Sequence, residues 1–382
     1  MSESQTPAGG GQAAPRPVAG ARPVSRPRPI DDIHLDELLD FVVEKNASDL
    51  HLSVDLPPVV RIDGDLKKMN YEPFTPQSMQ NMLYSILRDD QIQRFEEEYE
   101  LDFSYALQKK ARFRVNFYRD RGNCAAAFRL IPAIIPTTEQ LGLSPVVKDL
   151  ARRARGLVLV TGPTGSGKST TMAAIINYVN NTRRAHIITI EDPIEFIFPE
   201  DGLSLVQQRE VYEDTHSFAQ ALKYILRQDP DVVMVGEMRD LETISSVLTA
   251  AETGHLCFST LHTMDTGQTI DRIIDVFPSG QQEQVRVQLA SVIEGVICQK
   301  LLLDSTGENR IIALEIMLAT PAIRSLIRES KTHQIPTIIE SNGKMGMVTM
   351  DRYIANLLRM RKITREEAMH HAIKPEYMLK LL

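Results

Sequence analysis

Short apolar runs alternate with helical segments along the second part of this chain. From about Val146 onward, four runs rich in Val, Ile and Leu are each followed by turn or helix signals; they are residues 156–160, 186–190, 231–235 and 256–260. Strands that alternate with helices pack as a mainly parallel sheet, and ligands of such sheets bind at the carboxyl ends of the strands. Beyond Ser279 the pattern predicts mostly helix, with one strand near residues 310–317.

The segment from Asp31 to about Ser144 has a different, mixed pattern. Leu35, Leu38, Leu39 and Val42 repeat at the spacing of one helix face. The other expected elements are strands over residues 49–53, 59–63, 101–107, 111–118 and 125–130, and helices over residues 76–87 and 89–98. Prolines at 132 and 136 then indicate a linker. We therefore expect an α+β domain over residues 31–145 and an α/β domain over residues 146–382.

The composition is that of a soluble globular protein. The 382 residues are 43% hydrophobic and 24% charged, and no apolar run approaches the ~18 residues of a membrane-spanning helix. A chain of this length exceeds one typical core, so two domains and a tail are expected. Residues 1–30 are mostly Ala, Gly and Pro with a few arginines; they offer too little apolar surface to offset their ordering entropy, which predicts disorder.

The most specific motif follows the first of the four apolar runs. Residues 162–169 match G-x-x-x-x-G-K-[ST], between an apolar strand and a helix expected over residues 168–178. Such a loop directs backbone N–H groups at a phosphate chain, and the helix adds the positive end of its dipole. Lys168 then contacts the β- and γ-phosphates, and Ser169 takes a Mg²⁺ coordination position. The sequence predicts an ATP site with Mg²⁺ as cofactor, formed by Gly162, Pro163, Thr164, Gly165, Ser166, Gly167, Lys168, Ser169 and Thr170.

Acidic residues follow two of the other predicted strands. Glu191 and Asp192 come directly after residues 186–190, where carboxylates are well placed to hold Mg²⁺ or its waters; a solvated strand end is the alternative. Residues 231–235 resemble a Walker B strand, but Gly236 stands where an aspartate usually binds magnesium. We therefore expect Glu237 to polarise the attacking water and Glu191 or Asp192 to supply the missing metal contact.

One histidine and several arginines complete the candidate chemistry. His262 ends the last predicted core strand and is interpreted as a donor that senses the γ-phosphate, with a structural histidine as the alternative. A zinc site with nearby His255 and Cys257 is not expected, because no fourth ligand is apparent. Strand alternation places Arg112 and Arg114 on one face; they are either catalytic arginines, a class that accelerates phosphoryl transfer by ~10³–10⁵, or a solvated or domain-packing basic face.

Together these motifs resemble those of the secretion-type hexameric ATPases, which power type II secretion, type IV secretion and type IV pili. The motifs occur in the family's order, at residues 162–169, 191–195, 236–240 and 255–262. Three further stretches resemble those of type IV pilus retraction ATPases: residues 266–278, 322–329 and 346–351. The chain has neither a four-cysteine zinc insertion nor a long N-terminal docking domain, which fits retraction enzymes better than pilus-extension or secretion enzymes.

This resemblance implies a RecA-like P-loop ATPase core, a smaller α+β PAS-like N-terminal domain and a helical C-terminal region. It implies a hexamer in which ATP lies between domains and subunits, with Arg114 and Arg129 reaching the nucleotide. It also implies a cytoplasmic ring at the inner membrane, docked on the pilus platform protein, that drives retraction and twitching motility. An exposed amphipathic helix over residues 322–329 is the implied output surface. The residues after His262 depart from the commoner pattern, so an accessory role beside a paralogous retraction ATPase is a further implication.

Two other classes of function remain as alternatives. A RecA-like DNA motor needs an electropositive pore or aromatic stacking loops. The net charge of −7, the absence of Trp and the lack of a basic loop argue against it, so no nucleic acid is expected as a partner. A small-molecule kinase would need an acceptor pocket or lid, and the helical C-terminal third shows no signal for one.

Overall fold

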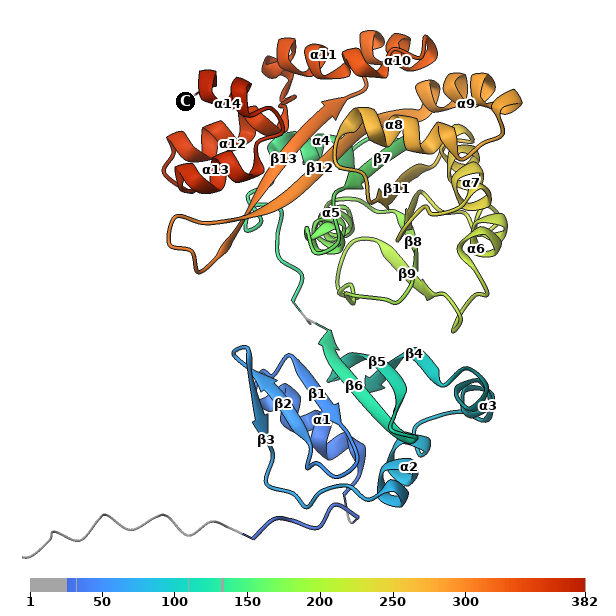
Figure 1. The fold of residues 1–382 in the computed structure, drawn as a ribbon. Helices are drawn as coiled ribbons and strands as arrows, with labels where there is room; N and C mark the ends of the chain where they lie inside the picture. The colour runs from blue at the N-terminus through green and yellow to red at the C-terminus, as the bar shows by residue number, and fades with distance from the viewer. Residues whose placement is uncertain (1–25, 32, 109, 132–133, 382) are drawn as a thin grey trace, which may run out of the picture. The chain divides into compact units, whose positions relative to one another are not determined.

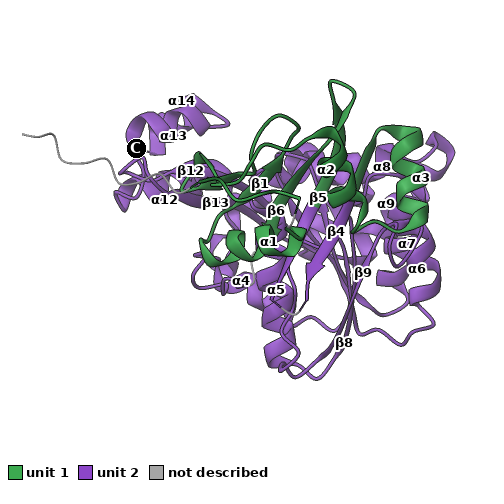
Figure 2. Cartoon of the chain, turned by 90° about the horizontal axis from the view of Figure 1, so that it is seen from below, with its two compact units in different colours: residues 1–102, 115–130 green, residues 103–114, 131–382 purple. Residues whose placement is uncertain are grey.

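The computed structural model describes residues 26–31, 33–108, 110–131 and 134–381. They form two compact units: unit 1 holds the residues up to 102 and residues 115–130, and unit 2 holds residues 103–114 and those from 131 onward (Figure 2). Of the tail expected to be disordered, residues 1–25 lie outside the described residues. Arg28, in contrast, forms an isolated β-bridge with Tyr71, and Ile30 is buried.

Unit 1 is organised around a six-stranded sheet ordered β3-β2-β1-β6-β5-β4 (Figure 1). Three phenylalanines of its core, Phe95, Phe117 and Phe128, pack edge to face with centroid distances of 6.0 and 6.2 Å. The predicted apolar face of the first helix is fully buried. The elements are α1 (Leu35–Glu44), β1 (Asp49–Leu52), β2 (Val59–Ile62), β3 (Asp65–Lys68), α2 (Pro76–Tyr84), α3 (Asp89–Glu98), β4 (Glu100–Leu107), β5 (Ala111–Asp120) and β6 (Asn123–Ile131), with the outer parts of β4 and β5 belonging to unit 2.

Unit 2 contains a seven-stranded sheet ordered β13-β12-β7-β11-β10-β8-β9. Every neighbouring pair is parallel except β12 and β13, which confirms the expected mainly parallel sheet. Its strands are β7 (Gly156–Thr161), β8 (His186–Glu191), β9 (Leu205–Glu210), β10 (Val232–Val235), β11 (Leu256–Leu261), β12 (Ile293–Leu303) and β13 (Arg310–Leu318). Its helices are α4 (Pro145–Ala151), α5 (Lys168–Thr182), α6 (Phe218–Ile225), α7 (Leu241–Glu252), α8 (Thr266–Asp275), α9 (Ser279–Val292), α10 (Pro321–Arg328), α11 (Ile335–Ser341), α12 (Met350–Arg359), α13 (Arg365–His371) and α14 (Pro375–Leu381), with short 3₁₀ turns η1 (Thr332–Gln334) and η2 (Gly343–Met345).

Helices cover both faces of this sheet, and the side chains of β7 show why its sequence is apolar throughout. Leu157 and Leu159 point into the core that α6, α7, α8 and α9 complete. Val158 and Val160 point into the opposite core, with α4 and α5. A strand buried on both faces loses the alternation of polar and apolar residues. Among the described residues, no helix combines the length and apolar composition needed to span a membrane.

The expectation of one strand beyond Ser279 is wrong, because β12 is a second one. β12 is an eleven-residue strand that pairs with β7 on one side and β13 on the other. Its sequence, IEGVICQKLLL, interrupts two short apolar runs with Glu294, Gln299 and Lys300, so it shows neither a continuous apolar run nor the alternation of a half-buried strand. Only its two neighbours in the sheet determine the strand.

The helix expected as an exposed output surface has its apolar face buried. α10 covers Pro321–Arg328, and its Ile323 and Ile327 have no exposed surface. Arg324 lies against the end of α9, donating to the carbonyls of Ala290 (2.7 Å) and Ser291 (2.9 Å) and to Glu294 (2.7 Å). The helix is amphipathic as expected: its apolar side is buried, while Pro321, Ala322 and Arg328 are exposed. Its role as an output surface stays a prediction.

Candidate active site

The phosphate-binding loop joins the end of β7 to the start of α5. Gly162 has a φ of 145° and Gly167 a φ of 84°, both in the region that favours glycine. A side chain at Gly162 would collide with the backbone carbonyl of Gln299. The Gln299 side chain also donates to the carbonyl of Ser166 at 2.5 Å. β12 therefore braces the loop from behind, which leaves its inner side facing the pocket.

Lys168 lies inside this loop. Its Nζ donates to the carbonyls of Gly162 (2.9 Å) and Pro163 (3.1 Å). Burial lowers the pKa of Lys168, while the attraction of Glu237 and Glu195 opposes that shift. Ser169 and Thr170 follow in the first turn of α5 and line the same pocket. The ammonium is thus held where a phosphate chain in the loop would meet it.

Four strand ends meet beside the loop. The order β7-β11-β10-β8 places the residues after each strand next to one another. Gly236 donates its N–H to the carbonyl of Ile190 at 2.8 Å, and Thr260 Oγ1 donates to the carbonyl of Gly236 at 2.5 Å. These bonds tie the ends of β8, β10 and β11 together, so that Glu191, Glu237 and His262 face one pocket.

Glu237 is paired on both carboxylate oxygens. Arg239 Nη2 lies 2.9 Å from one and His262 Nε2 lies 3.1 Å from the other. Desolvation raises the pKa of Glu237, but the bond from Arg239 and the charges of His262 and Arg239 outweigh it, so the pKa is lowered. The local ion pair that the adjacency of Arg239 and Asp240 suggests is not the one formed: Asp240 instead caps α7 through the N–H of Thr243 at 2.8 Å.

Glu191 and Asp192 differ in their surroundings. Glu191 is 7% exposed and accepts hydrogen bonds from Thr189 Oγ1 (2.6 Å) and Gln208 Nε2 (3.1 Å). Burial raises the pKa of Glu191 to about 7, although these two bonds act in the opposite direction. Asp192 is exposed and lines the pocket. Both carboxylates thus line the pocket: that of Glu191 is buried, and that of Asp192 is exposed to solvent.

The shifted pKa of Glu191 predicts a pH dependence of stability. Folded Glu191 binds its proton more tightly than the unfolded chain does, with a pKa of about 7 against 4.5. Its contribution to the free energy of unfolding is therefore fully present below pH 4.5 and is lost as the pH rises through 7. Between pH 5 and pH 8 we expect a loss of about 2 kcal/mol that the variant Glu191→Gln does not show. Denaturant unfolding in Mg²⁺-free buffer measures this, with the exposed Glu200→Gln as control; parallel profiles for Glu191→Gln and the parent protein would contradict it.

The pocket that these residues line has a volume of about 490 Å³. It brings together most of the residues that the sequence singled out. Its lining includes Thr164, Gly165, Gly167, Lys168, Ser169, Thr170, Glu191, Asp192, Glu237, His262 and Arg114. Glycines of the loop, an ammonium, a hydroxyl and carboxylates in one pocket fit a triphosphate with Mg²⁺. Arg129 is placed differently: it belongs to unit 1, donates to Asp49 at 2.9 Å and has a 73% exposed side chain.

Two glutamines next to the site were not found from the sequence. Gln299 braces the phosphate loop from β12, and Gln208 on β9 holds Glu191. Both lie on strands that were not expected from the sequence. The short apolar runs of residues 296–298 and 301–303 were the available signal for β12, whereas β9 has a mostly polar sequence and gave no such signal.

Known proteins resemble this chain over most of its length. Residues 28–374 match the family described as type II/IV secretion system protein. The type IV pilus retraction ATPase PilT of Pseudomonas aeruginosa is 49% identical over 342 residues, which cover 90% of this chain and 99% of that protein. The twitching motility protein of Neisseria gonorrhoeae is 47% identical over 321 residues, 84% of this chain and 86% of that protein. The crystal structure of the pilus retraction motor PilT with bound ADP superimposes with a TM-score of 0.85 at 46% identity, covering 91% of this chain and all of that one.

The fold and the pocket define a P-loop ATPase built on a parallel sheet. The chain belongs to the type II/IV secretion system protein family. The similarity to pilus retraction ATPases that the sequence motifs indicated is confirmed. The predicted α/β fold class and the assignment as an ATP hydrolase are confirmed as well.

Proposed function

We propose that this protein is a motor that couples ATP hydrolysis to type IV pilus retraction and so to twitching motility. One observation carries the proposal: the loop lysine, the ionised Glu237, His262 and Arg114 line one pocket at the ends of adjacent parallel strands. Relatives named as a pilus retraction ATPase and a twitching motility protein match 84–90% of the chain. The combination supports a nucleotide-driven motor of the retraction type.

Each residue of the pocket has a role that follows from its charge and position. Lys168 and the loop N–H groups hold the β- and γ-phosphates. Glu237, with its pKa lowered, is a carboxylate that orients and polarises the attacking water. His262, 3.1 Å from Glu237, reports the state of the γ-phosphate to that carboxylate. Mg²⁺, when bound by Ser169 with Glu191 or Asp192, supplies charge neutralisation at the phosphates.

The assembly and partners are part of the same proposal. Six copies form a ring in which a nucleotide lies between domains and subunits, and Arg114 and Arg129 complete the site there. In the proposed division by sequence the PAS-like domain covers residues 31–145 and the ATPase domain residues 146–382; the compact units differ from it, because residues 103–114 group with unit 2. The ring works at the cytoplasmic face of the inner membrane on the pilus platform protein, alone or beside a paralogous retraction ATPase.

Two measurements on the full-length protein test the proposal. The first is the rate of ATP hydrolysis with the solution mass, with and without Mg²⁺ and DNA. We expect a hexamer with Mg²⁺-dependent hydrolysis that DNA does not change; a monomer whose turnover needs DNA or a small acceptor would favour the alternative classes. The second is expression in a piliated bacterium that lacks its retraction ATPase. Recovered twitching supports retraction, whereas recovered pilus assembly in an extension-deficient strain would instead support a pilus-extension ATPase.

A further inference from the structure

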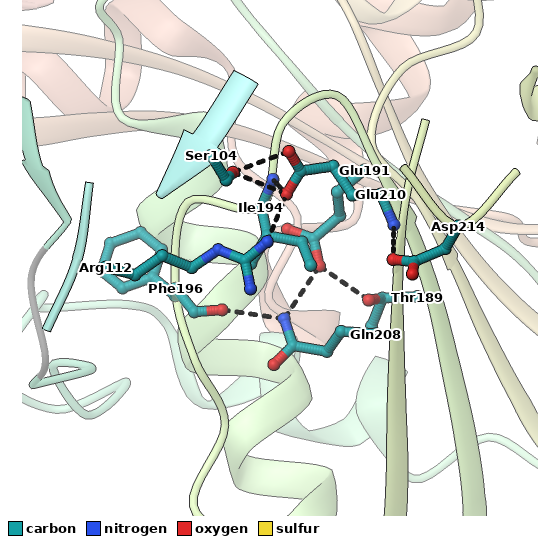
Figure 3. Close-up of polar contacts among 9 residues, drawn as sticks. All are labelled: Ser104, Arg112, Thr189, Glu191, Ile194, Phe196, Gln208, Glu210 and Asp214. Atoms are coloured by element: carbon teal, nitrogen blue, oxygen red, sulfur yellow. Dashed lines mark hydrogen bonds and ion pairs between the residues drawn. The ribbon is translucent and has the colours of Figure 1, made fainter. Parts of the chain in front are cut away.

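A short segment that precedes the ATPase core in sequence is anchored on a single buried carboxylate. Residues 103–114 belong to unit 2, and two of them, Ser104 and Arg112, contact Glu210 (Figure 3). Ser104 Oγ lies 2.6 and 2.7 Å from the two oxygens of Glu210, and Arg112 Nη2 donates to one of them at 2.8 Å. Glu210 is 2% exposed. A buried carboxylate with these partners holds them firmly, since leaving any of the charged groups unpaired is costly.

Glu210 also contacts the wall of the nucleotide pocket. The N–H of Ile194 donates to Glu210 Oε2 at 3.3 Å, and Pro193 and Glu195, on either side of Ile194, line the pocket. The backbone of Glu210 is itself fixed, because its N–H donates to Asp214 at 2.8 Å. One side chain thus joins residues 103–114 to the segment that follows Glu191.

The same strand holds the other carboxylate of the site. Gln208 lies two residues before Glu210 on β9, so both side chains leave the same face of the strand. Gln208 donates to Glu191 at 3.1 Å and to the carbonyl of Phe196 at 2.8 Å (Figure 3). Two side chains of β9 therefore act at the site: Gln208 hydrogen-bonds to Glu191, and Glu210 binds Ser104 and Arg112 of residues 103–114.

Arg114 is the residue whose position depends on this anchor. It lies two residues after Arg112 on β5, and buried Phe113 and Val115 on either side of it confirm that Arg112 and Arg114 share a face. Residues two apart on a strand are separated by ~7 Å, so fixing the guanidinium of Arg112 fixes where Arg114 leaves the backbone. Arg114 lines the nucleotide pocket.

We propose that Glu210 is a positioning residue for the reaction, which holds Arg114 at the nucleotide pocket through Arg112 and Ser104. The inference rests on the proposed function, in which Arg114 reaches the nucleotide. Glu210 is not one of the residues that line the pocket; it sets the distance between Arg114 and the pocket wall that Pro193 and Glu195 form. Positioning errors of about 1 Å at an active site cost up to ~10²-fold in rate.

A double-mutant cycle between Glu210→Gln and Arg114→Ala tests the inference. We expect Glu210→Gln to lower kcat by about 10- to 100-fold with little change in the KM for ATP, because the phosphate loop is intact. In the Arg114→Ala background the same substitution should lower kcat no further. If Glu210→Gln lowers kcat by the same factor in both backgrounds, or if either single variant has the parental kcat, the inference is overturned.

Two smaller changes keep the test valid if Glu210→Gln does not fold. Ser104→Ala removes one hydrogen bond from Glu210, and Arg112→Lys keeps the charge but loses the planar fork; both should lower kcat in the parent and neither in the Arg114→Ala background. The exposed Glu200→Gln is the matched control.

Lys168→Ala in the same series separates the two proposals. Parental hydrolysis by Lys168→Ala defeats the proposed function, whereas an inactive Lys168→Ala beside a fully active Glu210→Gln defeats only the inference drawn here.

Discussion

Glu237→Gln should bind ATP as tightly as the parent protein and hydrolyse it about 10²- to 10⁴-fold more slowly. This is the range by which positioned acid–base groups accelerate reactions. The lowered pKa of Glu237 keeps its carboxylate ionised at neutral pH, and an amide of the same shape cannot take up a proton from water. ATP binding should be spared because, in the proposed site, Lys168 and the loop hold the phosphates and Glu237 does not.

The measurement is a single-turnover assay with radiolabelled ATP beside an equilibrium binding assay. Glu242→Gln, at an exposed position in the first turn of the neighbouring helix α7, is the matched control and should behave as the parent. A Glu237→Gln variant with parental turnover would remove Glu237 from the mechanism. A variant that no longer binds ATP would assign Glu237 to binding instead.

Lys168→Ala should weaken nucleotide binding at least tenfold and abolish measurable turnover. Its ammonium is the cationic side chain placed inside the phosphate loop, where it donates to the carbonyls of Gly162 and Pro163. A hydrogen bond to a charged group contributes about 1.5–3 kcal/mol, which corresponds to roughly 10- to 150-fold in affinity. The further loss in rate follows because electrostatic stabilisation of the transferring phosphoryl group is removed, a term of ~10²–10³ for one donor.

Titration with a fluorescent ATP analogue measures the affinity, and phosphate release measures the rate. Lys223→Ala changes an exposed lysine on α6 and should leave both values at those of the parent. Lys168→Arg is a useful second variant, because burial lowers the pKa of Lys168 and arginine keeps its positive charge. The variant places a larger cationic group in the same loop. Parental affinity in Lys168→Ala would refute the assignment of the phosphate site.

The local features of the fold were predictable because they depend on short stretches of sequence. The apolar runs at β7, β8, β10 and β11 lie within one residue of the expected ends. The glycines of the motif predicted a loop with positive φ angles, and Gly162 and Gly167 do have positive φ. Since parallel strands end at one edge of a sheet, the residues at the ends of those strands, including Glu191, Glu237 and His262, were expected to converge, as they do.

The errors arose where the sequence does not show which partner a residue or segment takes. β12 was not expected, because it is identified only by pairing with β7, which lies more than 130 residues earlier, and with β13. The adjacency of Arg239 and Asp240 suggests an ion pair, but Arg239 pairs with Glu237 while Asp240 caps α7. In both cases the choice of partner came from the tertiary structure.

By itself the sequence determined the class of site: the phosphate loop, the order of the motifs around it and the parallel sheet that carries them. These follow from backbone geometry at glycines and from the periodicity of apolar residues, which act within a few positions. Only the tertiary structure decided how the site is held together. The bond from Gln299 to the loop, the pairing of Gln208 with Glu191 and the anchoring of Arg112 on Glu210 join residues 17 to 133 positions apart. Hydrogen bonds at such separations leave no periodic signal in the chain, because each depends on which strands the fold makes neighbours.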